Sequence, residues 1–230
     1  MANSPTTEKV IPYALLGMTA VTGLVDAVSF LSLGHVFTAN MTGNIVLLAF
    51  ATAHVSGLSI ARSSTALLAF LMGAILGGRV TARASADSQI RFAAQAFLLE
   101  VAFLLAASVS GIGYRGDLLE HSFQPFALIV LTALAMGTRN AAVRKLAIPD
   151  LTTTVLTLTI TGIGADSSLA NGNNPRLARR IASVASMFLG AALGAVVIHY
   201  SISAALGLAT AISAVCSVAL FRSEPTPDKR

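Results

Sequence analysis

A cluster of polar residues between Thr38 and Asn44 could bind a solute, although apolar sequence lies on both sides of it. The stretch from Gly23 to Ala51 begins apolar, breaks at Leu33-Gly34-His35, turns polar and then becomes apolar again. Hydroxyls and amides can replace part of a solute's hydration shell, and free N–H groups at a helix start favour anions. The structural alternative is simple capping of a helix start. The polar residues are Thr38, Asn40, Thr42, Gly43 and Asn44.

A second polar group lies between Thr152 and Thr161, where six threonines interrupt an apolar run. Thr157, Thr159 and Thr161 alternate as on a strand, whereas Thr154, Thr157 and Thr161 would share one face of a helix. Threonine hydroxyls can also bond back to their own helix or join neighbouring spans, which is the structural alternative. We expect Thr152, Thr153 and Thr154 to form part of the same solute site as the first group, near the membrane midplane.

Three ionisable residues, Asp26, Glu100 and Arg139, lie within apolar runs. A lone charge inside a membrane costs about 3 kcal/mol on insertion scales, so each needs a partner, a proton or water. We expect Asp26 to pair with Arg139 and, with Asn140, to contribute to the solute site; a purely structural ion pair is the alternative. Glu100 has no basic residue in its own span. It is either neutral and hydrogen-bonded, for example to Gln95, or a proton carrier, so Glu100 and Asp26 are the candidates for proton coupling.

The composition indicates a membrane protein. The chain has 230 residues, of which 55% are hydrophobic and 11% charged, whereas soluble domains carry about 25% charged residues. Several apolar runs of about 20 residues point to a chain that crosses the bilayer repeatedly. The net charge of +5 then reflects basic loops that set topology rather than a nucleic-acid-binding surface.

Motifs for catalysis are missing from the sequence. It contains no Walker loop, no G-x-S-x-G elbow and no H-E-x-x-H motif. Cys216 is alone and the four histidines are scattered, so neither a disulfide framework nor a metal site is expected. We therefore expect no enzymatic activity, no cofactor and no metal. An intramembrane enzyme would have to use Asp26 with Glu100, the one carboxylate pair within the apolar runs.

Eight apolar segments follow one another along the chain. Two of them, 41–55 and 152–164, are too short to cross a hydrocarbon core of about 30 Å comfortably. Pro12 is expected at the start of the first span. The remaining segments are expected to span the bilayer, at about 12–33, 65–79, 92–110, 123–142, 181–200 and 202–221.

An internal repeat relates the two halves of the chain. Gly23-Leu-Val-Asp26-Ala27 matches Gly137-Thr-Arg-Asn140-Ala141 at an offset of 114 residues, and the same offset places Asn40 on Thr154. Gly73-Ala-Ile-Leu-Gly77 matches Gly190-Ala-Ala-Leu-Gly194 at an offset of 117. The small residues at these last positions are also expected to pack helices closely.

Charge then selects a topology. If both short segments enter and leave on one side of the membrane, 13 of the 15 basic residues lie inside, and only Arg62 and Arg115 lie outside. Each repeat then has three spans, an odd number, so the two repeats run in opposite directions. The predicted fold is an all-α membrane protein with six transmembrane helices and two short re-entrant or half-depth segments, built as a 3+3 inverted repeat. Both termini are expected in the cytoplasm.

The motif G-x-x-D-A-x-S-F, followed by L-G-x-V-F-x-A-N-M-T-G-N, resembles the signature of the YoaK family of small bacterial inner-membrane proteins. The resemblance runs from about Pro12 to Phe221. It implies a polytopic fold and a location in the bacterial inner membrane, and it implies no activity.

The sequence predicts one membrane domain, 11–222, between short tails at 1–10 and 223–230. Its repeats are expected at about 12–112 and 123–221. The function we expect is a secondary transporter or channel for a small polar or anionic solute. The alternatives are a non-transporting accessory protein or an intramembrane enzyme. The expected partners are the lipid bilayer and the solute, with no nucleic acid, and assembly into a homo-oligomer is compatible with the sequence.

Overall fold

The computed structural model describes residues 5–82, 88–114 and 123–223, and the elements in these ranges are helices, with no strand. Six helices in the described ranges are long and apolar enough to cross a membrane, which confirms the predicted all-α membrane fold with six spans. They are α1 (Pro5–Ser32), α3 (Ile60–Thr81), α4 (Gln89–Ser110), α5 (Phe123–Leu146), α7 (Leu177–Ile198) and α8 (Ile202–Arg222).

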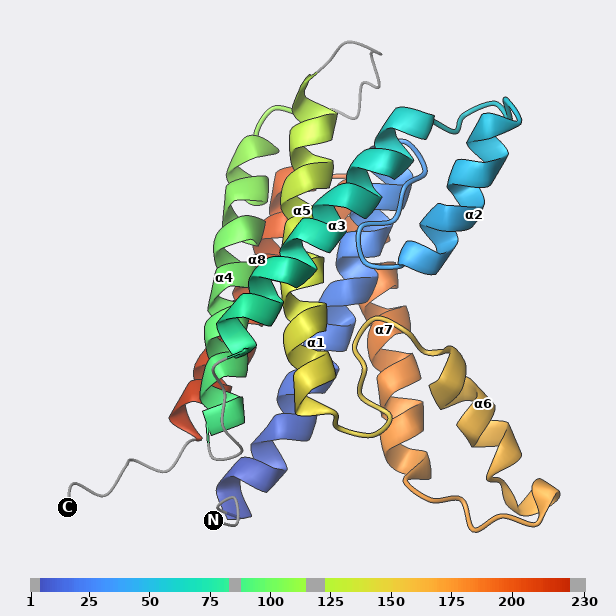
Figure 1. The fold of residues 1–230 in the computed structure, drawn as a ribbon, viewed down its shortest axis with the longest axis vertical. Helices are drawn as coiled ribbons and strands as arrows, with labels where there is room; N and C mark the ends of the chain where they lie inside the picture. The colour runs from blue at the N-terminus through green and yellow to red at the C-terminus, as the bar shows by residue number, and fades with distance from the viewer. Residues whose placement is uncertain (1–4, 83–87, 115–122, 224–230) are drawn as a thin grey trace.

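Two shorter apolar helices, α2 (Met41–Thr52) and α6 (Thr157–Ala165), lie beside the bundle, and a 3-10 helix, η2 (Ser168–Ala170), follows α6. At 1.5 Å per residue they are only about 18 and 14 Å long. Figure 1 shows that each begins part-way along the bundle and runs back to the end from which its preceding connection came. We call these connections the first hinge (residues 33–40) and the second hinge (residues 147–156).

The strand-like interpretation of the threonine run is wrong. Thr157 to Ala165 are helical, and the residues from Thr152 to Leu156 belong to the irregular second hinge. A single strand at membrane depth would leave its backbone groups unpaired, whereas a helix pairs them internally.

The first helix begins earlier than the sequence predicts. It starts at Pro5 and continues past Pro12, which was expected at its first turn. Proline removes one backbone N–H from the helix ladder, a loss that is tolerated close to the helix start. The predicted tail 1–10 is therefore helical from Pro5 onward, whereas residues 1–4 and 224–230 lie outside the described residues.

Helices α1, α4, α5 and α8 form the centre of the bundle, and α3 and α7 pack on its outside (Figure 1). Two buried apolar clusters fill this centre. The first includes Leu24, Leu104 and Met136, and the second includes Leu15 and Phe97. Along the central helices the clusters are separated by a buried polar layer described below.

Two helix pairs, α1 with α7 and α3 with α5, approach closely through glycines. A Cβ atom on Gly23 would collide with the carbonyl of Met187, and one on Gly137 would collide with that of Phe70. A Cβ atom on Gly73 would meet the carbonyl of Leu134, and one on Gly190 that of Ala20. The predicted role of Gly73 and Gly190 in close helix packing is confirmed.

These contacts occur at the repeat offsets. Gly23 and Gly137 differ by 114 residues, and the residues they touch, Met187 and Phe70, differ by 117. The two close pairs therefore use matching positions of the two halves.

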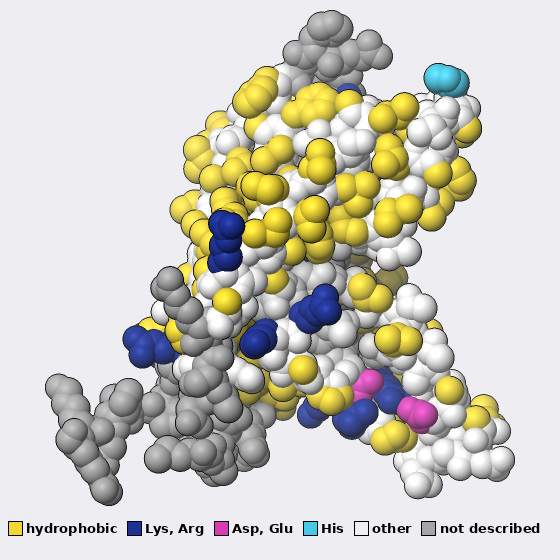
Figure 2. Space-filling view, in the orientation of Figure 1, with side chains coloured by type: hydrophobic (Ala, Val, Ile, Leu, Met, Phe, Trp, Pro, Cys, Tyr) yellow, Lys and Arg dark blue, Asp and Glu magenta, His cyan; other side chains and the backbone are white. Residues whose placement is uncertain are grey.

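Basic side chains gather at one end of the molecule. Figure 2 shows Lys and Arg over its lower part, the end at which α1 begins and α8 ends. Apolar side chains cover much of the visible upper part of the bundle. Such a band is the surface expected against lipid tails.

Candidate functional site

The first hinge is tied to the middle of α1. Asp26 lies 6 residues before the end of α1, about 9 Å into the bundle from that end. Its Oδ1 accepts a hydrogen bond of 3.0 Å from the backbone N–H of Ala39. The carboxylate thus holds the hinge at membrane depth, and the half-buried Asp26 lies directly beside the start of α2.

Two asparagines of the first polar group have structural partners. The buried Asn44 accepts from the N–H of Phe37 at 2.9 Å and donates to the carbonyl of the same residue. Asn40 caps α2 by accepting from the N–H of Gly43 at 3.4 Å. For these two residues the capping and bracing interpretation holds.

The hydroxyls of the first group differ from its amides. Thr38 is fully buried, and its hydroxyl has no hydrogen-bond partner among the described residues. Thr42 is exposed on α2. The polar groups left available for a ligand are therefore fewer than the sequence suggests.

The second hinge is tied to α5 at the matching position. Asn140 lies 6 residues before the end of α5, and its Oδ1 accepts a hydrogen bond of 3.2 Å from the hydroxyl of Thr154. Thr153 is fully buried with φ of 62° and an unpartnered hydroxyl. Thr152 is exposed and donates to the carbonyl of Val155 at 2.7 Å. Unlike α2, α6 begins without a side-chain cap.

The structure places the two polar groups apart rather than in one cluster. Each is bonded to its own half of the chain, about 9 Å from opposite ends of the bundle. Among the described helices α2 packs only on α3, and α6 only on α7 and η2. The prediction that both starts meet at the midplane is therefore wrong, because each hinge returns before reaching it.

Arg139 pairs with Glu100, and the predicted pair with Asp26 is wrong. The Nη1 atom of Arg139 lies 3.1 Å from Oε1 of Glu100, and both side chains are fully buried. Asp26 bonds to its own hinge instead. Glu100 therefore has a basic partner, on α5 rather than in its own span, and it does not form a carboxylate pair with Asp26.

The Arg139–Glu100 pair connects all four central helices. Arg139 also donates to the carbonyl of Met18 at 2.9 Å and to the hydroxyl of Thr22 at 2.5 Å, both on α1. Ser213 of α8 donates to Glu100 at 3.0 Å. One oxygen of Glu100, Oε2, and the Nε of Arg139 lack partners among the described residues. This polar layer lies between the two apolar clusters.

Comparison with known proteins identifies the family. A family model described as "Protein of unknown function (DUF1275)" matches residues 14–219, nearly the whole of the described bundle. The chain belongs to the DUF1275 family. It is also similar to the UPF0700 transmembrane protein YoaK of Bacillus subtilis (strain 168), with 38% identity over 155 residues. That match covers 67% of this chain and 65% of the relative, slightly less than two thirds of the relative's length. No solved structure matches.

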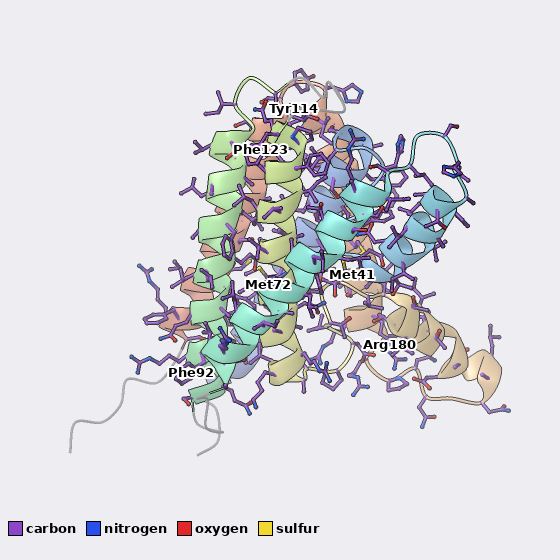
Figure 3. All side chains as sticks on the ribbon, turned by 45° about the horizontal axis from the view of Figure 1, so that its top comes forward. Met41, Met72, Phe92, Tyr114, Phe123 and Arg180 are labelled. Atoms are coloured by element: carbon purple, nitrogen blue, oxygen red, sulfur yellow. The ribbon has the colours of Figure 1, made fainter. Side chains whose placement is uncertain are left out.

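The sequence analysis of this DUF1275 chain overlooked the residues that hold α6. Arg180 of α7 donates to the carbonyl of Gly162 at 2.5 Å and to Oδ1 of Asp150 at 3.1 Å, and it pairs with Asp166 at 2.7 Å. Figure 3 labels Arg180 where α7 approaches α6. Arg176, one turn earlier, pairs with Asp150 at 2.6 Å. The spacing of four residues between two arginines near a short segment was the available signal.

Asp150 of the DUF1275 chain is held in its charged form. Burial alone would raise the pKa of Asp150, but hydrogen bonds from Arg180 and Arg176 outweigh burial and lower that pKa below its usual value. The positive charges of the same arginines act in the same direction. The second hinge is thus fastened by charges, in contrast to the amides of the first.

Proposed function

We propose that this DUF1275 protein is a secondary transporter or channel for a small polar or anionic solute. The observation that carries the proposal is the pair of hinges that interrupt helices at membrane depth. Irregular backbone persists there only where it is buried in protein or lines a water-filled cavity. Helices broken in corresponding positions of two repeats are typical of transporter sites.

The donors at the hinges favour an anion or a polar neutral solute over a bare cation. The hinges offer hydroxyls and the free N–H groups at the start of α6, whereas cation sites use carbonyls or carboxylates. In the first half the Asp26 carboxylate already receives the N–H of Ala39. The neutral Asn140 occupies the matching place in the second half, so we assign the anionic group of the solute to that half.

The candidate residues divide into two roles in this proposal. Arg139 and Glu100 hold the central helices together, because both are fully buried and paired. Asp26 is the better candidate for proton coupling, since it is half-buried at a hinge. We propose contact with solute for the first group, with Thr38 and Asn40, and for the second, with Asn140 and Thr152 to Thr154. Thr42 and Asn44 complete the first group by positioning α2.

We further infer an inverted repeat and a cytoplasmic location for the basic end. Matching glycine contacts at offsets of 114 and 117 residues support the repeat. Eight basic residues at the described end that holds the start of α1 support the orientation, because cytoplasmic ends carry excess Lys and Arg. They are Arg79, Arg91, Arg144, Lys145, Arg176, Arg179, Arg180 and Arg222. A bacterial inner membrane is the matching location.

The experiment uses purified protein in proteoliposomes. After a hyperosmotic shock with a panel of small anions and polar neutral solutes, light scattering reports re-swelling when a solute enters. At least one solute should enter faster than in protein-free vesicles, and Asn140→Asp should slow entry of an anion by placing a charge beside its site. Thr132→Val, a buried change remote from both hinges, is the control. Equal entry with and without protein for the whole panel contradicts the proposal.

A non-transporting accessory protein is the competing function, and the structural bonds of Asp26, Asn40 and Asn44 favour it. Single cysteines at Asn40 and Thr154, in a Cys216→Ser background, separate the two functions. A passage makes both reactive toward a water-soluble thiol reagent, whereas a cysteine at the lipid-facing Leu105 stays unreactive. Two unreactive hinges in a folded protein would favour the accessory function.

A further inference from the structure

The outward surface of α2 and α6, here called the α2–α6 face, is uncovered. Each helix packs on one spanning helix, α2 on α3 and α6 on α7, and the two do not contact each other. Figure 1 places both on the same side of the bundle, opposite α4. The remainder of each short helix therefore points away from the molecule.

The α2–α6 face combines apolar side chains with unpaired hydroxyls. Neither helix contains Asp, Glu, Lys or Arg. The described part of the chain offers no hydrogen bond to the hydroxyls of Thr42, Thr157 and Thr161, all of which are exposed. Thr157, Thr161 and Ala165 are exposed at a spacing of four residues, a small-residue row that allows another helix to approach. The exposed residues of the face include Thr42, Ile45, Val46, Phe50, Thr157, Leu158, Ile160 and Thr161.

Backbone donors add to the unpaired groups of this face. The first N–H groups of a helix have no partner within it. The start of α6 lacks a side-chain cap, and among the described residues no hydrogen bond reaches the N–H of Thr157, Leu158 or Thr159. Since the hinge before α6 is bonded to Asn140, these donors lie within the hydrocarbon depth.

Lipid tails cannot cover such a surface. They offer no hydrogen-bond acceptor, and exposed irregular backbone does not occur against lipid. Water cannot cover it alone, because a groove open sideways to lipid has no wall to retain water. A passage along the hinges is incomplete until protein closes this side.

We propose that a second copy of this chain closes the α2–α6 face, about a two-fold axis along the membrane normal. In this arrangement α2 faces α2 and α6 faces α6, each at its own depth. A two-fold interface joins a patch to itself, so the patch must be complementary to itself. Hydroxyls both donate and accept, and a patch without charges has no self-repulsion, so this face meets that condition. Threonines that face each other across helices then pair.

Cysteine crosslinking of the full chain in native membranes tests the interface. In a Cys216→Ser background, Leu158→Cys on α6 and Ile45→Cys on α2 place thiols on the face, where the native side chains are 79% and 61% exposed. Oxidation with copper phenanthroline should give a disulfide-linked dimer from each. Leu98→Cys and Leu105→Cys on α4, on the opposite side, are the exposed controls. No dimer from the face, or equal dimer from all four positions, overturns the proposal.

Counting photobleaching steps of singly labelled wild-type protein in highly diluted lipid vesicles gives a second measurement. Two steps per spot are expected, and Thr157→Leu with Thr161→Leu should shift spots toward one step. A single step for the wild type overturns the proposal even where a cysteine variant fails to fold. Neither readout depends on transport, so a dimer without solute movement would reject the proposed function and leave the interface standing.

Discussion

The two hinges occupy matching positions in the repeat but are fastened by different chemistry. The first is braced from within, by Asn44 on Phe37 and by Asp26 on Ala39. The second is fastened from outside, by Arg180 of α7 on Asp150 and Gly162. A neutral hydroxyl–amide bond from Thr154 to Asn140 replaces the carboxylate bond at its start. One backbone design can therefore be held either by local amides or by a distant ion cluster, and the two halves should respond differently to mutation, salt and pH.

The largest effect should come from the layer that joins the halves. Arg139→Met alone should reduce the stability of the folded state by about 3–5 kcal/mol, because it leaves the buried Glu100 without its partner. Unfolding in mild detergent measures the change.

Replacing both partners tests whether the loss comes from the orphaned charge. Arg139→Met with Glu100→Met should be at least as stable as the single variant, because apolar residues of similar size can replace a buried pair. A double variant that is worse than Arg139→Met would show that the pair stabilises beyond mutual neutralisation.

The internal brace of the first hinge comes next. Asn44→Ala should cost about 1–3 kcal/mol, because the buried N–H and carbonyl of Phe37 lose their partners. Its repeat mate Leu158 is 79% exposed, so Leu158→Ala is the matched control and should change stability little. Thermal unfolding of both variants measures the difference, and equal losses would mean that the halves are braced alike.

The external fastening of the second hinge should break with Arg180→Met. The variant loses the bonds to Asp150, Gly162 and Asp166, so α6 should detach while the spans stay folded. Limited proteolysis between Asp166 and Arg176 should become faster. Arg179→Met, next to it and with no printed partner at α6, removes the same charge and should leave the cleavage rate unchanged. Equal cleavage of both variants would assign the effect to net charge alone.

The smallest effect concerns pH and should be confined to the second half. The pKa of Asp150 is lower in the folded protein than its value of about 3.9 in an unfolded chain. Its stabilising contribution is therefore complete above about pH 4 and is lost as the pH falls through the lowered value. Unfolding between pH 3 and pH 6 should show a flatter acid limb for Asp150→Asn than for the wild type. Parallel curves would remove Asp150 from the fastening.

The candidate site was predicted in its members but not in its connections. Asp26, Asn140 and Thr154 were placed by the repeat offset, and the structure sets each beside a hinge. The partner of Arg139 was mistaken, because pairing inside a bundle depends on the rotation of α4 against α5. That rotation is fixed by packing and leaves no trace in either helix alone.

By itself, the sequence determined the membrane class, the six spans, the two short segments and the offsets of the repeat. Each of these follows from local apolarity, segment length and residue spacing, which are properties of a chain read along its length. Only the tertiary structure decided that Glu100 meets Arg139, that the hinges lie in separate halves and that Arg180 holds α6. Those outcomes depend on side chains brought together from distant segments, such as Glu100 and Arg139, which are 39 residues apart. Their pairing is set by close packing of helices, whose register and rotation local sequence does not specify.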